Sequence, residues 1–242
     1  VPVAGVAATT SAQCTSLLSV GMDDNALWTP LPAEQYGTEQ VPLAGAPSGG
    51  VSLSADGQTA AVATAKGVVL LVGGRPVANV LVDYDATAVS ISPAGDQVAV
   101  GAANMKVYIY EVEGGALRQA AVLEKHRGAV TVVAYSPDGS MLATADANRE
   151  IVVWDRTTRE VKKSKMVFHS ARVQCLAWSP SSEMLASGSL DMSIIVWPMG
   201  EGARVTHARA HTEGVTQLAF TDATTLVSAG ADACLRVWTV AA

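Results

Sequence analysis

The stretch Val130–Trp154, VTVVAYSPDGSMLATADANREIVVW, decides the fold, and Val173–Trp197, VQCLAWSPSSEMLASGSLDMSIIVW, repeats its pattern. Each copy holds three short apolar runs, which in the first copy are separated by Pro-Asp-Gly and Asp-Ala-Asn. Such runs are too short for helices, and the Gly, Pro, Asp and Asn residues between them are typical of turns between β-strands. The stretch therefore predicts consecutive antiparallel strands, with Asp138 and Gly139 forming a hairpin turn.

The same pattern recurs along the whole chain. The clearer copies close at Leu71, Tyr110, Trp154, Trp197 and Trp238, which are separated by 39, 44, 43 and 41 residues. A weaker copy runs through Leu17–Thr29 and closes near Trp28. A poorer fourth run follows in some copies, at Leu117–Leu123 and at Met166–Phe168. Four antiparallel strands in every 40 to 45 residues or so are typical of the blades of a β-propeller.

These copies predict an all-β fold of about six four-stranded antiparallel blades in a single domain over residues 1–242. We expect the blades at residues 1–44, 45–84, 85–124, 125–168, 169–210 and 211–242. The last copy ends at Trp238–Ala242 without a fourth run, and the first starts with its own first strand near Val3–Ala8. Because a propeller closes its last blade with a strand from the other chain end, we expect an incomplete ring that is part of a longer protein.

Composition excludes several classes of function. The 242 residues are 49% hydrophobic and 16% charged, which suits a chain that buries a core and argues against disorder. With 16 Lys and Arg against 22 Asp and Glu, the net charge of −6 argues against a nucleic-acid partner. No apolar run approaches the roughly 18 residues that a membrane-spanning helix needs, so we expect no membrane partner.

Reactive groups are scarce in the sequence. The cysteines Cys14, Cys175 and Cys234 are far apart and are expected to be buried thiols rather than metal ligands. No GxxxxGK[ST] or HExxH motif occurs, and Gly45–Gly50 lacks the context of a dinucleotide site. We therefore expect no catalytic residues, no cofactor and no metal, and we predict that the protein is not an enzyme.

With its Trp154-Asp155 dipeptide and its repeat length, the chain resembles the WD-repeat family over nearly all of its length. Members place a His before the first strand of a blade and an Asp in the turn between the second and third strands. The resemblance implies three structural pairs: His169 with Asp191, His211 with Asp232, and His126 with Asn148, with Asp146 close by. The remaining histidine, His207, is expected at the solvated edge of a fourth strand over Val205–Arg209.

Several segments narrow the resemblance to the C-terminal propeller of the actin-interacting protein 1 family. They are Ser19–Trp28 (SVGMDDNALW), Ala94–Gly101 (AGDQVAVG), Val130–Ser136 (VTVVAYS), Cys175–Pro180 (CLAWSP) and Ala186–Met192 (ASGSLDM). This resemblance implies two linked seven-bladed propellers in the whole protein, and this chain would be an incomplete part of the second, with about six of its seven blades. It also implies a scaffold that binds actin filaments together with cofilin and promotes their disassembly. Its location would be the cytoplasm and the cytoskeleton, with a cilium or flagellum as a further option.

Two other functions remain open. The chain could be a scaffold subunit of another assembly, such as a ciliary, trafficking or ubiquitin-transfer complex, in which a propeller face receives a partner. An enzyme built on a propeller is the third and weakest reading.

Cations gather in the loops near the expected His and Asp residues. Lys125, Arg127, Arg149 and Arg172 are our candidates for contacts with an acidic partner. The alternative is that they are ordinary solvated charges, because Glu124, Asp146 and Glu150 lie among them. Two further segments are expected to be loops, Pro30–Pro42 and the basic Arg156–Lys165, and the second could attract an acidic partner.

Overall fold

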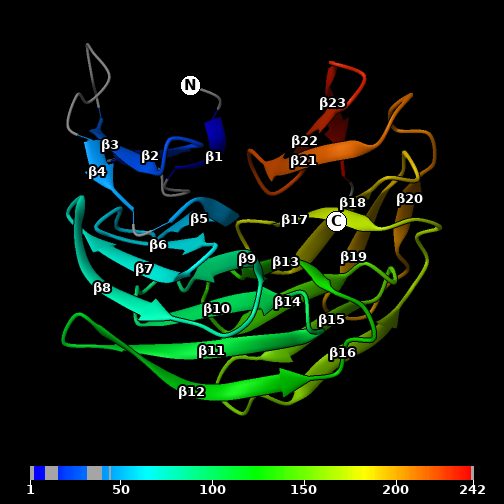
Figure 1. Ribbon diagram of the computed structural model, residues 1–242. Helices are drawn as coiled ribbons and strands as arrows, with labels where there is room; N and C mark the ends of the chain where they lie inside the picture. The colour runs from blue at the N-terminus through cyan, green and yellow to red at the C-terminus, as the bar shows by residue number, and fades with distance from the viewer. Residues whose placement is uncertain (1–2, 9–15, 32–39, 44, 241–242) are drawn as a thin grey trace. The chain divides into compact units, whose positions relative to one another are not determined.

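The computed structural model describes residues 3–8, 16–31, 40–43 and 45–240 (Figure 1). Cys14 and residues 32–39 of the expected loop at Pro30–Pro42 lie outside these residues. Within the described ranges, every regular element is a β-strand, as the sequence predicts. None of them contains a helix long and apolar enough to cross a membrane.

The strands form antiparallel sheets in two compact units. Unit 1, Val1–Lys125, holds three sheets of four strands each. The first sheet contains β1 (Val3–Ala8), β2 (Ser16–Gly21), β3 (Asn25–Pro30) and β4 (Gln40–Pro42). The second contains β5 (Pro47–Leu53), β6 (Thr59–Thr64), β7 (Gly67–Val72) and β8 (Arg75–Leu81). The third contains β9 (Ala86–Ile91), β10 (Gln97–Ala102), β11 (Lys106–Glu113) and β12 (Ala116–Glu124).

Unit 2, His126–Ala242, holds two sheets of four strands and one of three described strands. Its first sheet contains β13 (Val130–Tyr135), β14 (Met141–Asp146), β15 (Ile151–Asp155) and β16 (Val161–Met166). The second contains β17 (Val173–Trp178), β18 (Met184–Ser189), β19 (Ile194–Pro198) and β20 (Val205–His207). The third contains β21 (Val215–Phe220), β22 (Thr225–Gly230) and β23 (Leu235–Thr239). The predicted fold class is therefore confirmed, while the grouping of all sheets into a single domain stays a prediction.

The core of unit 2 lies between neighbouring sheets. All six residues of β14 and all six of β18 are buried, because each strand has a partner on both sides and a neighbouring sheet against its face. Small side chains such as Ala143 and Ala186 allow this close packing, while Trp178 and Trp197 fill the wider space between the sheets. The continuous apolar runs seen in the sequence are thus the middle strands of the sheets.

In unit 2, short turns join the first and second strands of each sheet. In the turn between β13 and β14, Gly139 has a φ of 70°, a conformation that glycine adopts without steric cost. Asp138 accepts hydrogen bonds from the Ser136 hydroxyl at 2.5 Å and from the Ser140 backbone N–H at 3.0 Å. Partial burial works against ionisation, but these hydrogen bonds outweigh it and lower the pKa of Asp138 to about 2.

One fourth strand differs from the prediction. The sequence suggests Met166–Phe168 as a strand and the basic segment Arg156–Lys165 as a loop, whereas β16 covers Val161–Met166. Lys162, Lys163 and Lys165 therefore belong to a strand, which forms the outer edge of its sheet. An edge strand in contact with water tolerates lysines and needs no apolar alternation, so the pattern that marks the buried strands is missing here.

Candidate functional site

A buried network of four side chains crosses the sheet β17–β20. His169 precedes β17, Asp191 lies in the turn between β18 and β19, and Ser187 and Trp197 lie in these two strands. The Nδ1 atom of His169 lies 3.0 Å from Asp191 Oδ2, and its Nε2 atom lies 2.8 Å from Ser187 Oγ. Trp197 Nε1–H donates to the same hydroxyl at 2.9 Å. We call this arrangement the His–hydroxyl–Trp network; it ties three neighbouring parts of one sheet together.

The network recurs in the other two sheets of unit 2. In the sheet β21–β23, His211 lies 2.9 Å from Asp232 and 2.7 Å from Ser228, and Trp238 donates to Ser228 at 2.8 Å. In the sheet β13–β16, His126 lies 2.7 Å from Thr144, to which Trp154 donates at 2.9 Å. The structure therefore brings together His169 with Asp191 and His211 with Asp232, as the resemblance implies.

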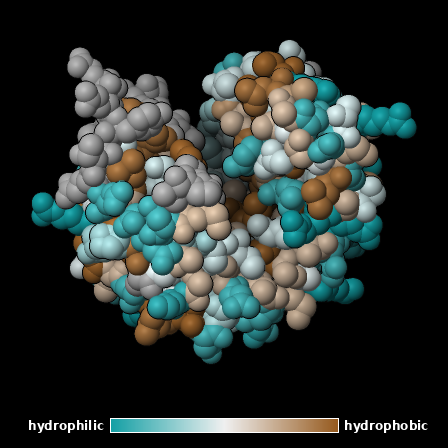
Figure 2. All heavy atoms as spheres, turned by 45° about the horizontal axis from the view of Figure 1, so that its top comes forward, coloured by the Kyte–Doolittle hydropathy of each residue, from teal (hydrophilic) through white to brown (hydrophobic). Residues whose placement is uncertain are grey.

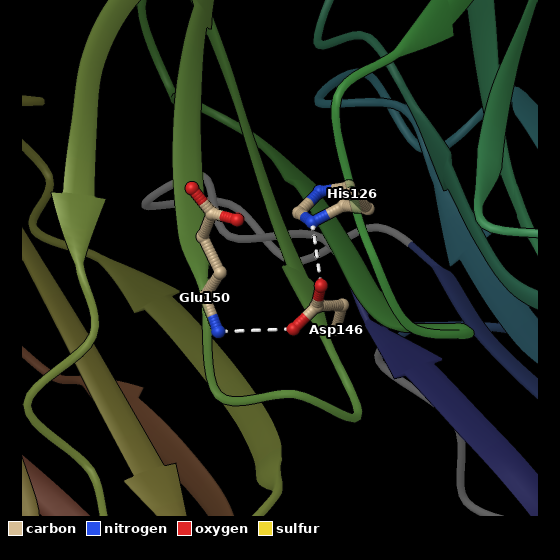
Figure 3. A group of neighbouring side chains, drawn as sticks. All are labelled: His126, Asp146 and Glu150. Atoms are coloured by element: carbon tan, nitrogen blue, oxygen red, sulfur yellow. Dashed lines mark hydrogen bonds and ion pairs between the residues drawn. The ribbon is translucent and has the colours of Figure 1, made fainter.

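The partner of His126 differs from the expected Asn148. The Nδ1 atom of His126 lies 3.3 Å from Asp146 Oδ2, the longest of the three His–carboxylate contacts (Figure 3). Asp146 ends β14 and holds the turn, because its carboxylate accepts the backbone N–H groups of Arg127 at 3.2 Å and Glu150 at 2.9 Å. Asn148 instead donates to the Arg127 carbonyl at 2.7 Å. The predicted pair is thus corrected to His126 and Asp146.

Burial and hydrogen bonding fix the protonation states in the sheet β17–β20. Burial lowers the pKa of His169 below its usual value and outweighs the attraction of Asp191, so the ring is neutral at pH 7. Burial alone would raise the pKa of Asp191, but hydrogen bonds from the Ser193 hydroxyl and the Ser170 backbone N–H hold it below its usual value. His169 therefore donates from Nδ1 to Asp191 and accepts the Ser187 hydroxyl proton at Nε2.

The order Ser187, His169, Asp191 has the hydrogen-bond pattern of a serine hydrolase triad, but its surroundings do not suit that chemistry. A nucleophilic hydroxyl must reach a substrate carbonyl, whereas the Ser187 side chain is 0% exposed. Its oxygen also accepts the Trp197 N–H, so a lone pair that a nucleophile would use is already engaged. The network therefore acts by fixing the strands and the turns at one end of each sheet.

The sequence reasoning missed the hydroxyl and tryptophan members of these networks. Thr144, Ser187 and Ser228 each stand ten residues before the tryptophan to which they bond. This constant offset is visible in the sequence and could have identified them.

One group of side chains has the composition of a metal site. His126, Asp146 and Glu150 each offer a ligand atom, and these atoms lie within 4.8 Å of one another (Figure 3). The Glu150 carboxylate points away from Asp146, whose own oxygens already accept two backbone N–H groups. In the corresponding turns of the other two sheets of unit 2, Asp191 and Asp232 likewise accept backbone N–H groups, so we assign these residues to the turn.

Three of the four candidate cations lie at one end of unit 2. The backbone N–H groups of Arg127 and Arg149 both donate to Asp146, at 3.2 Å each, so the two exposed arginines flank one turn. Arg172 is also exposed, and its carbonyl accepts Leu190 N–H, as the Ala129 carbonyl accepts Ala147 N–H in the neighbouring sheet. Lys125 is exposed but belongs to unit 1, so the structure does not place it relative to the other three.

The remaining histidine and two of the cysteines differ in their exposure to solvent. His207 is half-buried in β20, with its ring centroid 4.9 Å from that of Trp238, rather than solvated as expected. Cys175 is buried, and burial raises the pKa of its thiol to about 12. Cys234 is a free and exposed thiol, so the prediction that it is buried is wrong.

Apolar and polar side chains are mixed over the face seen in Figure 2, where hydrophobic groups occur in several separate clusters. Among the described residues on this face, neither unit shows a single broad apolar area. A partner site must therefore be identified from local chemistry rather than from hydropathy alone.

Comparisons with known proteins agree with this structure. The family described as WD domain, G-beta repeat, matches residues 117–155, 161–198 and 202–239. Each matched segment begins in the outer strand of one sheet and continues through three strands of the next, as residues 161–198 do with β16 and β17–β19.

Similar curated proteins extend the comparison to the whole chain. The 66 kDa stress protein of Physarum polycephalum is 38% identical over 99% of this chain and 41% of its own length. Actin-interacting protein 1-2 of Arabidopsis thaliana is 47% identical over 71% of this chain and 29% of its own length. Actin-interacting protein 1 of Drosophila melanogaster is 33% identical over 91% of this chain and 36% of its own length. The chain thus spans about two fifths or less of each relative. It is a WD-repeat protein, and it resembles the actin-interacting protein 1 group.

Proposed function

We propose that the chain is a non-catalytic interaction scaffold that binds actin filaments together with cofilin and promotes their disassembly in the cytoplasm. The observation that carries this proposal is the 47% identity, over 174 residues, to a protein named actin-interacting protein 1-2. Cofilin and the disassembly activity come from the family resemblance of the sequence and are part of the proposal.

The structure suits a binding role for physical reasons. The His–hydroxyl–Trp networks hold the turns of unit 2 in place before any partner arrives, so binding orders few additional residues. Arg127, Arg149 and Arg172 extend from these turns, and no described carboxylate lies within ion-pair distance of their guanidinium groups. Together with Lys125 they remain our candidate contacts with an acidic partner surface.

Co-sedimentation with actin filaments tests the proposal. We expect more of the chain in the pellet when the filaments carry cofilin than when they are bare, and faster loss of light scattering from the decorated filaments. Absence of the chain from the pellet under both conditions would contradict the proposed function.

Charge reversal tests the candidate contacts. Because rim charges steer and orient a partner, Arg127→Glu combined with Arg172→Glu should reduce binding to decorated filaments about tenfold or more. The matched control is Arg75→Glu combined with Arg118→Glu, which makes the same change of charge on the outer strands β8 and β12. Equal loss of binding in both double variants would refute these residues as contacts. It would not contradict the proposal that the chain binds decorated filaments.

A further inference from the structure

A groove in unit 2 lies between the outer strand β16 and the strands β19 and β20 of the next sheet. Its volume is about 500 Å³, which is within the usual range of ligand pockets. All of its walls come from described residues of this unit. The groove is separate from the turns that carry Arg127, Arg149 and Arg172.

The groove gathers positive charge on a chain whose net charge is −6. Lys163, Lys165 and Arg204 line it, and none of the described lining residues is acidic. None of these three cations has a described carboxylate within ion-pair distance. Lys163 Nζ donates to the Pro198 carbonyl, which places its charge at the junction of the two sheets. The positive charge is therefore available to an anionic partner.

An aromatic platform lies beside these cations. Phe168 is 54% exposed, and its ring centroid lies 5.9 Å from that of the buried Trp197. The Arg204 guanidinium carbon lies 3.4 Å above the Phe168 ring centroid. An arginine stacked in this way keeps its N–H donors at its edge, where a carboxylate can accept two of them. This site thus combines the apolar surface of Phe168 with the N–H donors of Arg204.

The strained backbone of Lys165 determines the direction of its side chain. Lys165 has a φ of 62°, a left-handed backbone conformation that residues other than glycine adopt at a steric cost. It lies at an irregularity in the pairing of β15 with β16, between the pairs Val153–Lys163 and Ile151–Met166. Such bulges change the direction of a side chain on an edge strand, and here Lys165 lines the groove.

We propose that this groove binds an acidic peptide segment of a partner protein. A carboxylate of the peptide pairs with Arg204 and Lys165, and a neighbouring apolar side chain of the peptide packs on Phe168. A free anion would use the cations but would leave Phe168 uncovered, and the negative charge of the whole chain opposes a nucleic acid. An acidic peptide offers carboxylates and apolar side chains together, which matches the cations and the exposed Phe168 of the groove. This inference does not depend on the proposed actin function.

Fluorescence anisotropy with the whole chain tests the proposal. The probe is a labelled glutamate-rich peptide with two central leucines, and the comparison peptide carries serines in place of the leucines. We expect saturable binding of the leucine peptide that weakens with added salt, and weaker binding of the serine peptide. No saturable binding, or equal binding of the two peptides, would overturn the proposal, and equal binding would indicate a simple anion site.

Variants of the groove residues complete the test. Arg204→Glu and Lys165→Glu should each weaken binding about tenfold or more, because each replaces an attraction by a repulsion. Lys162→Glu is the matched control, since Lys162 is an exposed cation of the same strand that does not line the groove. Phe168→Ala should weaken binding of the leucine peptide and leave that of the serine peptide nearly unchanged. Equal effects of Lys162→Glu and Lys165→Glu would refute the groove as the site.

A glycine variant separates binding from folding. Lys165→Gly removes the cation and also relieves the left-handed strain. We expect this variant to lose affinity for the peptide while it unfolds at the same temperature as the unchanged chain, or a higher one. Full affinity of Lys165→Gly would exclude Lys165 from the site.

Discussion

Ser187 accepts a hydrogen bond from Trp197, bonds to His169 and has no contact with solvent. Its removal leaves two buried polar groups without their partner, and each such group costs free energy that water cannot recover. A hydroxyl of this kind therefore contributes more to stability than its small size suggests.

We expect Ser187→Ala to lower the free energy of unfolding by about 1–3 kcal/mol, because buried donors and acceptors lose their partners. Urea unfolding followed by tryptophan fluorescence measures this change. The control is Ser170→Ala, an exposed serine beside His169, for which we expect a change within about 0.5 kcal/mol. Similar changes in both variants would contradict the structural role of the network.

Sequence spacing predicts some members of the networks and misses others. The separations of His169 from Asp191 and of His211 from Asp232 recur and are visible in the sequence. Near His126, however, Asp146 and Asn148 both fall within the turn, and only the direction of each side chain shows which one faces the ring. Spacing places a residue along the chain and does not give the direction in which it points.

The sheets β17–β20 and β21–β23 pack so closely that a single methyl group matters. A Cβ atom added at Gly188, in β18, would lie 2.6 Å from a methyl group of Val215 and 2.7 Å from the sulfur of Cys175. Both distances are shorter than real contacts, and Val215 belongs to the next sheet. The spacing between these two sheets therefore depends on this glycine.

We expect Gly188→Ala to destabilise the chain by about 1–3 kcal/mol through overpacking. Gly200→Ala is the control, since no atom beyond its own and its two neighbouring residues lies within 4 Å of the position that its Cβ would take. Thermal unfolding of the two variants measures the difference. A Gly188→Ala variant as stable as Gly200→Ala would show that the sheets can separate at no cost.

Strands are predictable from sequence to the extent that they are buried. The second apolar run of the stretch Val130–Trp154, at Met141–Ala145, matches β14 to within one residue, because the core selects its side chains. The lysine-rich β16 has no such pattern, since water covers one edge and part of its surface. The groove could not be predicted from the sequence either, because it combines Lys165 on a bulge of β16 with Arg204, which lies just before β20 of the next sheet.

The stability of the whole molecule should depend on pH through its buried titratable groups. The folded state lowers the pKa of His169 and of the carboxyl groups of Asp146, Asp191 and Asp232. A lowered pKa means that the fold favours the deprotonated form. For His169, this stabilisation is complete above pH 6.5, its pKa in the unfolded chain, and is lost as the pH falls through the folded pKa.

We therefore expect the urea midpoint to fall as the pH is lowered from 7 to 5, and to fall further near pH 4 as the carboxyl groups become protonated. His169→Gln should lower the midpoint at pH 7 and flatten its decline between pH 6.5 and 5, because the titrating ring is gone. Parallel curves for the two proteins would contradict the lowered pKa of His169.

The offset between the matched repeats and the sheets has a consequence for mechanical behaviour. Residues 161–198 supply the last strand of one sheet and the first three strands of the next. One sequence repeat therefore connects two adjoining sheets. A force applied at β20 would strip an edge from one sheet before it reached the body of its neighbour. Unfolding under force should thus proceed from one sheet to the next, and loss of one repeat would remove strands from two sheets at once.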